Sequence, residues 1–239
     1  MPPSSHPPPP QHHLILIHGA WAGSWVWDSV QPILQALDGY LVHAVDLPGH
    51  HSGEPDVTLD TYCQHVQTIV ADIPPSDRVS IIAHSGAGVI ALQVAENLSA
   101  VMETCAPHGS IHSLVIVAGM LLPSGMTYTD FRATLPSELS EEPLELVFTP
   151  DGSSSTVPLA SALQCFFQDF PDPALAQQAA CRLRAQPTGG LAIAAVYQKD
   201  GTMARSIPKL YVHATRDASV RFPVQQAMVE TARANGMLA

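Results

Sequence analysis

Residues 79–88 read VSIIAHSGAG, and this stretch decides the expected fold. A run of β-branched and apolar residues enters a sharp turn with Ser85 at its apex, and a helix rich in small residues follows. This is the sequence form of a nucleophile elbow, a strand-to-helix turn that holds a serine hydroxyl above the sheet at a positive φ costing about 1–3 kcal/mol. Because strand and helix approach closely there, the neighbouring residues must be small, as Ala83, Ala87 and Gly88 are. The alternative is a strand followed by a glycine-loosened helix with Ser85 as its N-cap.

The composition of the 239 residues indicates one large α/β domain, since 46% are apolar and only 13% are charged. A net charge of -11 with two lysines, Lys199 and Lys209, argues against nucleic acid or an anionic membrane as partner. No apolar run approaches the roughly 20 residues that span a bilayer. The cysteines Cys63, Cys105, Cys165 and Cys181 lack paired spacing, which predicts free thiols and a cytoplasmic location.

Apolar runs alternate with helical patterns on both sides of residues 79–88. Strands are expected at residues 14–17, 41–45, 79–83, 113–118 and 209–213. Helices are expected at residues 28–37 after an Asp28 cap, 59–73 after a Thr58 cap, 86–105, and 220–235 before a Gly236 stop. Continuous apolar strands separated by helices are typical of a mostly parallel sheet covered on both faces, so the fold class is α/β.

The chain divides into three parts by its composition. Residues 1–13 form a proline-rich leader without regular structure, in which His12 and His13 are included. Residues 14–120 and 208–239 form the α/β core. Residues 121–207 carry proline-punctuated helical pieces, at 130–135, 158–169, 173–185 and 190–198, with one strand-like run at 144–148. A helical segment inserted between two strands of a parallel sheet is expected to form a cap over the carboxyl ends of the strands, where ligands bind in open α/β sheets.

A serine nucleophile needs donors for the oxyanion, and two glycine turns supply candidates. The sequence His18-Gly19-Ala20-Trp21 follows the first expected strand, so the backbone N–H of Ala20 can point into the same crevice as that of Gly86. Two main-chain donors aimed at a developing negative charge form an oxyanion hole. The alternative for the first turn is a glycine turn that only ends a strand.

Four motifs occur in order along the chain: HGAWAGSWVW at residues 18–27, AVDLPGH at 44–50, AHSGAG at 83–88 and YVHATRD at 211–217. Together they resemble the α/β-hydrolase superfamily, in the branch that contains hydroxynitrile lyases, plant methylesterases and microbial esterases. Residues 165–187 are similar to the cap of that branch. The resemblance implies an α/β-hydrolase fold with a helical cap, and it implies that Asp217 is the catalytic acid. Ala83 and Ala87 depart from the family pattern, which has glycine there.

The family's catalytic histidine follows the acid, after a helix and one more strand, and no histidine follows Asp217. The sequence is therefore expected to lack the family's C-terminal strand and helix, which would expose a sheet edge and favour a homodimer. Three explanations stay open: a shortened sequence, a natural loss of the base, or its replacement by His84, His18 or His213.

The expected function is that of a serine hydrolase acting on an ester, lactone or similar carbonyl of a small, fairly apolar molecule. Ser85 attacks, the N–H groups of Ala20 and Gly86 hold the oxyanion, and Asp217 orients an imidazole. Trp21, His84 and Phe166 are expected to line the substrate pocket. Neither a dinucleotide motif nor a spaced histidine pair is present, so no cofactor and no metal are expected. The alternative is a non-hydrolytic protein of the same fold, either a ligand-binding pseudo-enzyme or a lyase or cyclase.

Overall fold

The computed structural model describes residues 9–50, 56–102, 110–141, 143–190, 194–196 and 206–238. Its centre is a five-stranded sheet with the order β2-β1-β3-β4-β8, and every neighbouring pair is parallel. The strands are β1 (His12–Ile17), β2 (Tyr40–Val45), β3 (Arg78–His84), β4 (Ser110–Val117) and β8 (Lys209–Val212). The mostly parallel sheet expected from the sequence is confirmed.

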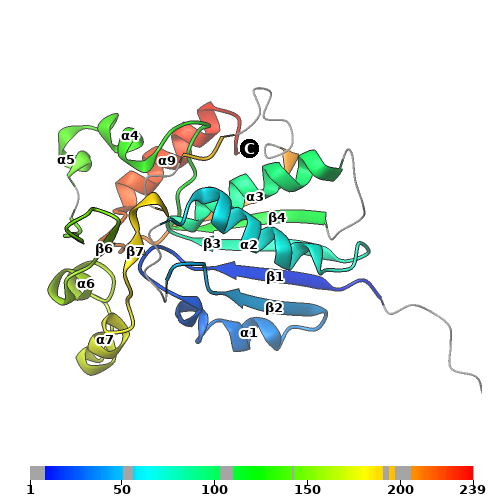
Figure 1. The fold of residues 1–239 in the computed structure, drawn as a ribbon, viewed down its shortest axis with the longest axis horizontal. Helices are drawn as coiled ribbons and strands as arrows, with labels where there is room; N and C mark the ends of the chain where they lie inside the picture. Colours follow the sequence, from blue (N-terminus) through cyan, green and yellow to red (C-terminus); the bar gives the residue numbers. More distant parts are fainter. Residues whose placement is uncertain are drawn as a thin grey trace, which may run out of the picture.

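Alternate residues of each strand face different layers of helices. Ile15 and Ile17 pack into the main core with α2 (Leu59–Ala71), α3 (Ala87–Met102) and α9 (Phe222–Ala234). Leu14 and Leu16 face the opposite side, where Trp27 packs on them. That side carries the 3₁₀ helix η1 (Ser24–Trp27) and α1 (Gln31–Gln35). Figure 1 shows α1 beside β2, away from α2 and α3.

Two helix signals of the sequence are confirmed, and one is wrong. Thr58 caps α2 in a capping box with Thr61, and α9 ends just before Gly236, whose φ is 68°. The helix expected at residues 28–37 is instead two short elements, η1 and α1. Pro32 stands in the first turn of α1, which favours a helix start there, and Asp28 ends η1 rather than capping a helix.

The cap over the sheet is not purely helical. It contains α4 (Tyr128–Ala133), α5 (Ser137–Ser140), α6 (Leu159–Cys165), α7 (Pro173–Ala180) and the 3₁₀ helix η2 (Thr188–Gly190). It also contains an antiparallel sheet of the order β5-β6-β7, made by β5 (Val147–Phe148), β6 (Ser154–Thr156) and β7 (Gln186–Pro187). These strands have two or three residues each, too few for an alternating pattern to reveal them. The helix expected at residues 190–198 falls largely outside the described residues, and residues 194–196 are not helical.

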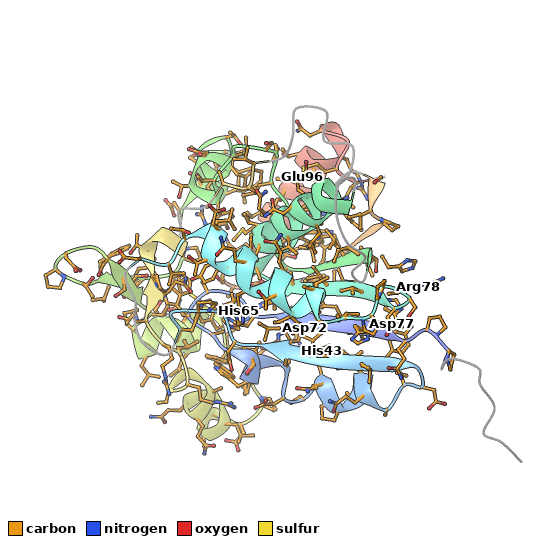
Figure 2. The ribbon with its side chains drawn as sticks, turned by 45° about the vertical axis from the view of Figure 1, so that its right-hand side comes forward. His43, His65, Asp72, Asp77, Arg78 and Glu96 are labelled. Carbon is orange, nitrogen blue, oxygen red and sulfur yellow. The ribbon has the colours of Figure 1, made fainter. Side chains whose placement is uncertain are left out.

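The cap elements gather at one end of the central sheet, beyond the carboxyl ends of its strands (Figure 1). The opposite end carries a polar cluster in which His13 bonds to His43 at 2.9 Å and to Asp77 at 3.2 Å. Asp77 and Arg78 lie at this opposite end, where β3 begins (Figure 2). Burial is the main reason why the pKa of His43 is lowered. This cluster joins β1, β2 and the residue before β3 at the end of the sheet opposite Ser85, so it stabilises the sheet rather than the crevice.

β1 begins inside the segment that the sequence predicts as leader, because His12 and His13 belong to the strand. His12 bonds to Ser80 of β3 at 2.8 Å, which ties it to the sheet. Residues 1–8 lie outside the described part. In the ranges that the structure describes, no helix has both the length and the apolar character needed to cross a membrane.

Candidate functional site

Ser85 sits at the turn between β3 and α3, with a φ of 54° that few non-glycine residues adopt. Its backbone is held on both sides, since its N–H donates to Val117 O at 3.1 Å and its carbonyl accepts from Met120 N at 2.9 Å. Gly88 N also donates to the Ser85 carbonyl, at 3.1 Å. The strained elbow predicted from residues 79–88 is thus present, and the alternative of a relaxed helix N-cap at Ser85 is wrong.

Three glycines, Gly19, Gly88 and Gly119, allow the backbones around Ser85 to approach closely. A Cβ atom at Gly19 would lie 2.7 Å from the Cβ of Ser85, too close for any side chain. A Cβ atom at Gly88 would overlap the backbone carbonyl of Met120. Ala83 and Ala87, where the family pattern has glycine, are buried without strain of this kind. A Cβ atom at Gly119 would lie 2.9 Å from the carbonyl oxygen of Ser85, so the close contacts fall on Gly19, Gly88 and Gly119.

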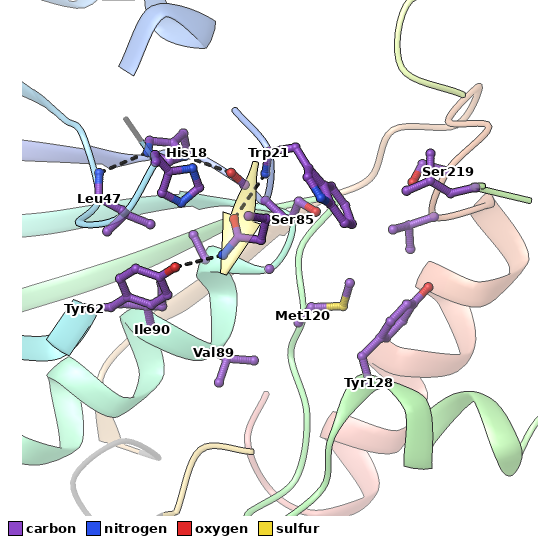
Figure 3. Close-up of a pocket in the computed structure, with 18 of the residues that line it drawn as sticks. His18, Trp21, Leu47, Tyr62, Ser85, Val89, Ile90, Met120, Tyr128 and Ser219 are labelled. Atoms are coloured by element: carbon purple, nitrogen blue, oxygen red, sulfur yellow. Dashed lines mark hydrogen bonds between the residues drawn. The ribbon is translucent and has the colours of Figure 1, made fainter. Parts of the chain in front are cut away.

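A cavity of about 220 Å³ opens beside Ser85 and includes both candidate oxyanion donors in its wall (Figure 3). The N–H groups of Ala20 and Gly86 donate no hydrogen bond to any group in the part of the chain that the structure describes. Apolar side chains form much of the remaining wall, among them Leu47, Val89, Ile90, Met120, Leu144 and Leu146. The cavity is thus apolar apart from a few polar groups near Ser85.

A second cavity, of about 430 Å³, shares Ala20, Trp21 and Ser85 with the first, and its wall also includes Asp217. Asp217 Oδ1 accepts from the N–H groups of Ser219 at 2.8 Å and Val220 at 3.0 Å. Oδ2 accepts no hydrogen bond from the described residues. Burial raises the pKa of the Asp217 carboxyl, and the nearby charge of Asp169 raises it further. The hydrogen bonds from the two backbone N–H groups lower this pKa, but by less than the burial and this charge together raise it. Asp217 and Ser85 therefore share a cavity, as the resemblance implies.

Of the three histidines considered as replacement bases, His18 has both ring nitrogens bonded, and His213 lies outside both cavities. His18 Nδ1 donates to Gly19 O at 2.8 Å, and Nε2 accepts from Leu47 N at 3.1 Å, which fixes one neutral tautomer. His213 packs between the rings of Tyr211 and Phe222 and lines neither cavity. His18 and His213 thus do not act on Ser85 in this arrangement.

His84 is the histidine that lines the second cavity together with Ser85 and Asp217. Its Nδ1 is buried and has no hydrogen-bond partner among the described residues. Burial, and to a smaller degree His18, lower the pKa of His84 to about 4. The imidazole is therefore neutral at pH 7 and a weak base, since general bases work best with a pKa near the operating pH.

The lowered pKa of His84 predicts a pH dependence of stability. The unfolded chain binds a proton at His84 below about pH 6.5, whereas the folded protein does so only near pH 4, so the stability present above pH 6.5 is lost as the pH falls toward 4. We expect His84→Gln to reduce the drop in unfolding free energy between pH 7 and pH 4.5 by about 2 kcal/mol. Urea unfolding at both pH values measures this drop. His65→Gln, on the surface of α2, is the control and should keep the wild-type drop; an equal drop in His84→Gln would contradict the expectation.

The three residues expected to line a substrate pocket all reach one of the cavities. Trp21 lines both cavities, and Phe166 and His84 line the second. The rings of Trp21 and Phe166 stack with centroids 6.3 Å apart. Among the described residues no group of three or more histidine, cysteine, aspartate or glutamate side chains could hold a metal ion. Cys63, Cys165 and Cys181 are free thiols.

A family model described as the alpha/beta hydrolase family matches residues 14–236. The chain belongs to this family. Among curated α/β hydrolases, polyneuridine aldehyde esterase of Rauvolfia serpentina is 33% identical over 79 residues, covering 31% of this chain and 30% of that protein. Methylesterase 2 of Arabidopsis thaliana is 31% identical over 80 residues, again covering 31% of this chain and 30% of that protein. The matched segment thus spans less than a third of each relative.

Solved structures of α/β hydrolases share the fold over most of the chain. The crystal structure of polyneuridine aldehyde esterase superposes with a TM-score of 0.72 at 19% identity and covers 92% of this chain and 87% of that one. A pyrethroid hydrolase from Sphingobium faniae JZ-2 gives 0.69 at 23% identity and covers 92% and 84%. The α/β-hydrolase fold expected from the four motifs is confirmed.

Two polar residues of the α/β-hydrolase site have no signal in the sequence. Gln186 of the cap and Tyr62 of α2 line the first cavity and bond to each other at 2.8 Å. Burial raises the pKa of the Tyr62 hydroxyl to about 12, so it stays protonated. Because the two residues are far apart in the sequence and lie in ordinary helical or coil patterns, only the folded cap brings them together.

Proposed function

We propose that this α/β hydrolase is an esterase-type serine hydrolase acting on an ester or lactone of a small, fairly apolar molecule. Ser85 would attack the carbonyl carbon, and the oxyanion that forms would accept hydrogen bonds from the N–H groups of Ala20 and Gly86. Asp217 would orient the imidazole that takes the proton of the serine. The cytoplasm is the proposed location.

One observation carries the proposal: the strained Ser85 lines one cavity with the backbone N–H groups of Ala20 and Gly86, which have no hydrogen-bond partner among the described residues. Ala20 and Gly86 are only partly buried in the wall of this cavity, so their N–H groups are open to an oxygen of a ligand bound beside Ser85. Strain at a φ of 54° is retained where the surroundings impose it, and such sites are concentrated at active sites. An oxyanion donor of this kind is worth roughly 10²–10³ in rate.

The cavities support a small apolar substrate with a carbonyl at Ser85. Both include Ser85 in their walls, so the acyl part and the leaving group of an ester can each occupy one of them. Their volumes, about 220 and 430 Å³, fit a small molecule rather than a polymer. Esterases among the relatives add support for the same chemistry.

Labelling with a fluorophosphonate probe tests the proposal, because the probe reacts with activated serines. We expect one adduct per chain, mapped to Ser85 by mass spectrometry of the digested protein. Hydrolysis of p-nitrophenyl butyrate, followed in parallel, reports turnover. A folded sample that takes up no probe would rule out the hydrolase.

A ligand-binding protein without acyl transfer is the second candidate, and the histidines favour it. In the described ranges, the histidine that shares a cavity with Ser85 and Asp217 is His84, whose pKa of about 4 makes it a weak base. This candidate predicts that small apolar esters raise the melting temperature of the protein without being consumed. Product analysis after prolonged incubation separates it from the hydrolase.

A further inference from the structure

We propose that Gln186 of the cap is the positioning residue for the oxyanion donor of Ala20. This inference rests on the proposed function, because it assigns a task to the loop that carries Ala20. It concerns the residue after Ala20: Trp21 adopts a φ of 59° and requires outside contacts to keep that conformation.

Every hydrogen bond that Trp21 makes within the described residues goes to the cap. Its N–H donates to Gln186 Oε1 at 3.2 Å, and its carbonyl accepts from Arg184 N at 2.8 Å. Its indole Nε1 donates to Ser155 Oγ at 3.2 Å. Since no bond to the central sheet holds Trp21, the left-handed backbone of this residue depends on the cap.

Gln186 is itself held firmly, which makes it a suitable support. It is 2% exposed, and its Nε2 donates to the Tyr62 hydroxyl at 2.8 Å. Tyr62 is buried in the core on α2. Gln186 and Ser155 lie opposite each other in the β6–β7 pair of the cap sheet. The pairing of these two strands therefore positions both side chains that bond to Trp21. Figure 3 shows the dashed bonds that run from Tyr62 to the cap strand and on to Trp21.

This support reaches the oxyanion donor through the backbone. The N–H of Ala20 lies in the Gly19–Ala20 peptide, whose oxygen Gly19 O accepts from His18 Nδ1 at 2.8 Å, and Gln186 holds the next peptide through Trp21 N. The two peptides meet at the Cα of Ala20, so releasing the Trp21 peptide shifts that Cα and changes the direction of the Ala20 N–H. Gly19 has no side chain to restrict its own φ and ψ, so contacts from neighbouring groups fix the conformation of this turn. Gln186 therefore couples the closed cap to the geometry of the oxyanion site, and opening the cap would release both.

Gln186→Met tests the coupling, because methionine has nearly the same shape and neither donates nor accepts here. We expect the Trp21 amide, followed by hydrogen–deuterium exchange of a peptide covering residues 18–24, to exchange at least 10-fold faster. We expect fluorophosphonate labelling of Ser85 to slow about 10-fold and kcat on p-nitrophenyl butyrate to fall similarly, with KM within twofold. Gln178→Met, exposed on α7, is the matched control and should resemble wild type in all three measurements.

Tyr62→Phe provides a second variant that folds even if Gln186→Met does not. It removes only the far bond of Gln186, so we expect a smaller change in the same direction, about two- to fivefold in exchange and in labelling. A purely structural role of Gln186 would lower the melting temperature and leave exchange at Trp21 and labelling at Ser85 unchanged, and this result would overturn the proposal. Faster exchange with unchanged labelling would overturn it too.

Failure of the proposed function gives a different result. In that case wild-type protein takes up no probe at all, whereas the exchange of the Trp21 amide still reports whether Gln186 holds the loop. Unchanged exchange in both variants overturns the role of Gln186 whether or not Ser85 is reactive. Faster exchange in both, graded as stated, supports the role of Gln186 at the oxyanion donor only together with slower labelling of Ser85; without labelling it shows that Gln186 holds the loop and overturns the oxyanion role.

Discussion

Replacing Ser85 by either Ala or Gly is expected to abolish fluorophosphonate labelling, while the two variants differ in stability. Neither variant has a hydroxyl at the elbow, so both lose the adduct and the turnover of p-nitrophenyl butyrate below detection. The φ of 54° costs an alanine about 1–2 kcal/mol and a glycine nothing, whereas glycine loses about 0.5–1 kcal/mol through the greater freedom of the unfolded chain. Ser85→Gly should therefore be more stable than Ser85→Ala by about 0.5–1 kcal/mol in urea unfolding.

The control for this pair is Ser99→Ala, a buried serine further along α3, which should keep full labelling. An adduct that forms on another residue of folded Ser85→Ala would show that this other residue, and not Ser85, is the nucleophile. A glycine variant no more stable than the alanine variant would mean that the turn does not impose the left-handed backbone. The two readouts are independent, so the elbow's geometry and its chemistry are tested separately.

The sequence predicts the central sheet well because its signals are local. Each strand of the parallel sheet contains a short apolar run, and the capping box at Thr58 and the stop at Gly236 mark helix ends within a few residues. The cap is predicted less well. Its β5, β6 and β7 strands are two or three residues long and pair across the cap, so their partners rather than their own residues define them.

The same difference separates the parts of the candidate site. Ser85, Ala20 and Gly86 are found from the sequence because tight turns after strands need particular small residues, and Asp217 is found through the family resemblance. Gln186 is missed because it lies 165 residues from Trp21 in the chain and its role depends on the cap sheet. No local pattern distinguishes a glutamine that holds a loop from one on the surface.

The histidines show a further limit of the sequence. His18, His84 and His213 all lie near the ends of strands, and the sequence leaves each of them open as a base. Hydrogen-bond partners and burial differ between the three only in the folded protein, where His18 is fixed between Gly19 and Leu47 and His84 has a pKa of about 4. Basicity depends on the environment of the ring, and the residue type alone does not set it.

Gly88→Ala is expected to destabilise the protein by about 3 kcal/mol, because its methyl group has no space. The added Cβ would meet the backbone carbonyl of Met120, and a backbone atom cannot move aside as the end of a long side chain can. Met120 is itself fixed, since its N–H donates to the Ser85 carbonyl at 2.9 Å. The helix α3 would have to shift away from Met120, which also displaces Ser85, so we expect slower probe labelling together with the loss of stability.

Gly86→Ala is the matched control, two residues earlier in the same turn. A Cβ atom at Gly86 meets nothing within 4 Å, so we expect a change within about 1 kcal/mol in urea unfolding. The backbone N–H of residue 86 is retained in this variant, so labelling of Ser85 should continue. Equal stability of Gly88→Ala and Gly86→Ala would contradict the close approach of α3 to Met120. It would also contradict the explanation that residue 88 must lack a side chain because of this approach. A large loss in Gly88→Ala alone would place that requirement at residue 88, rather than at Ala83 and Ala87, where the family pattern has glycine.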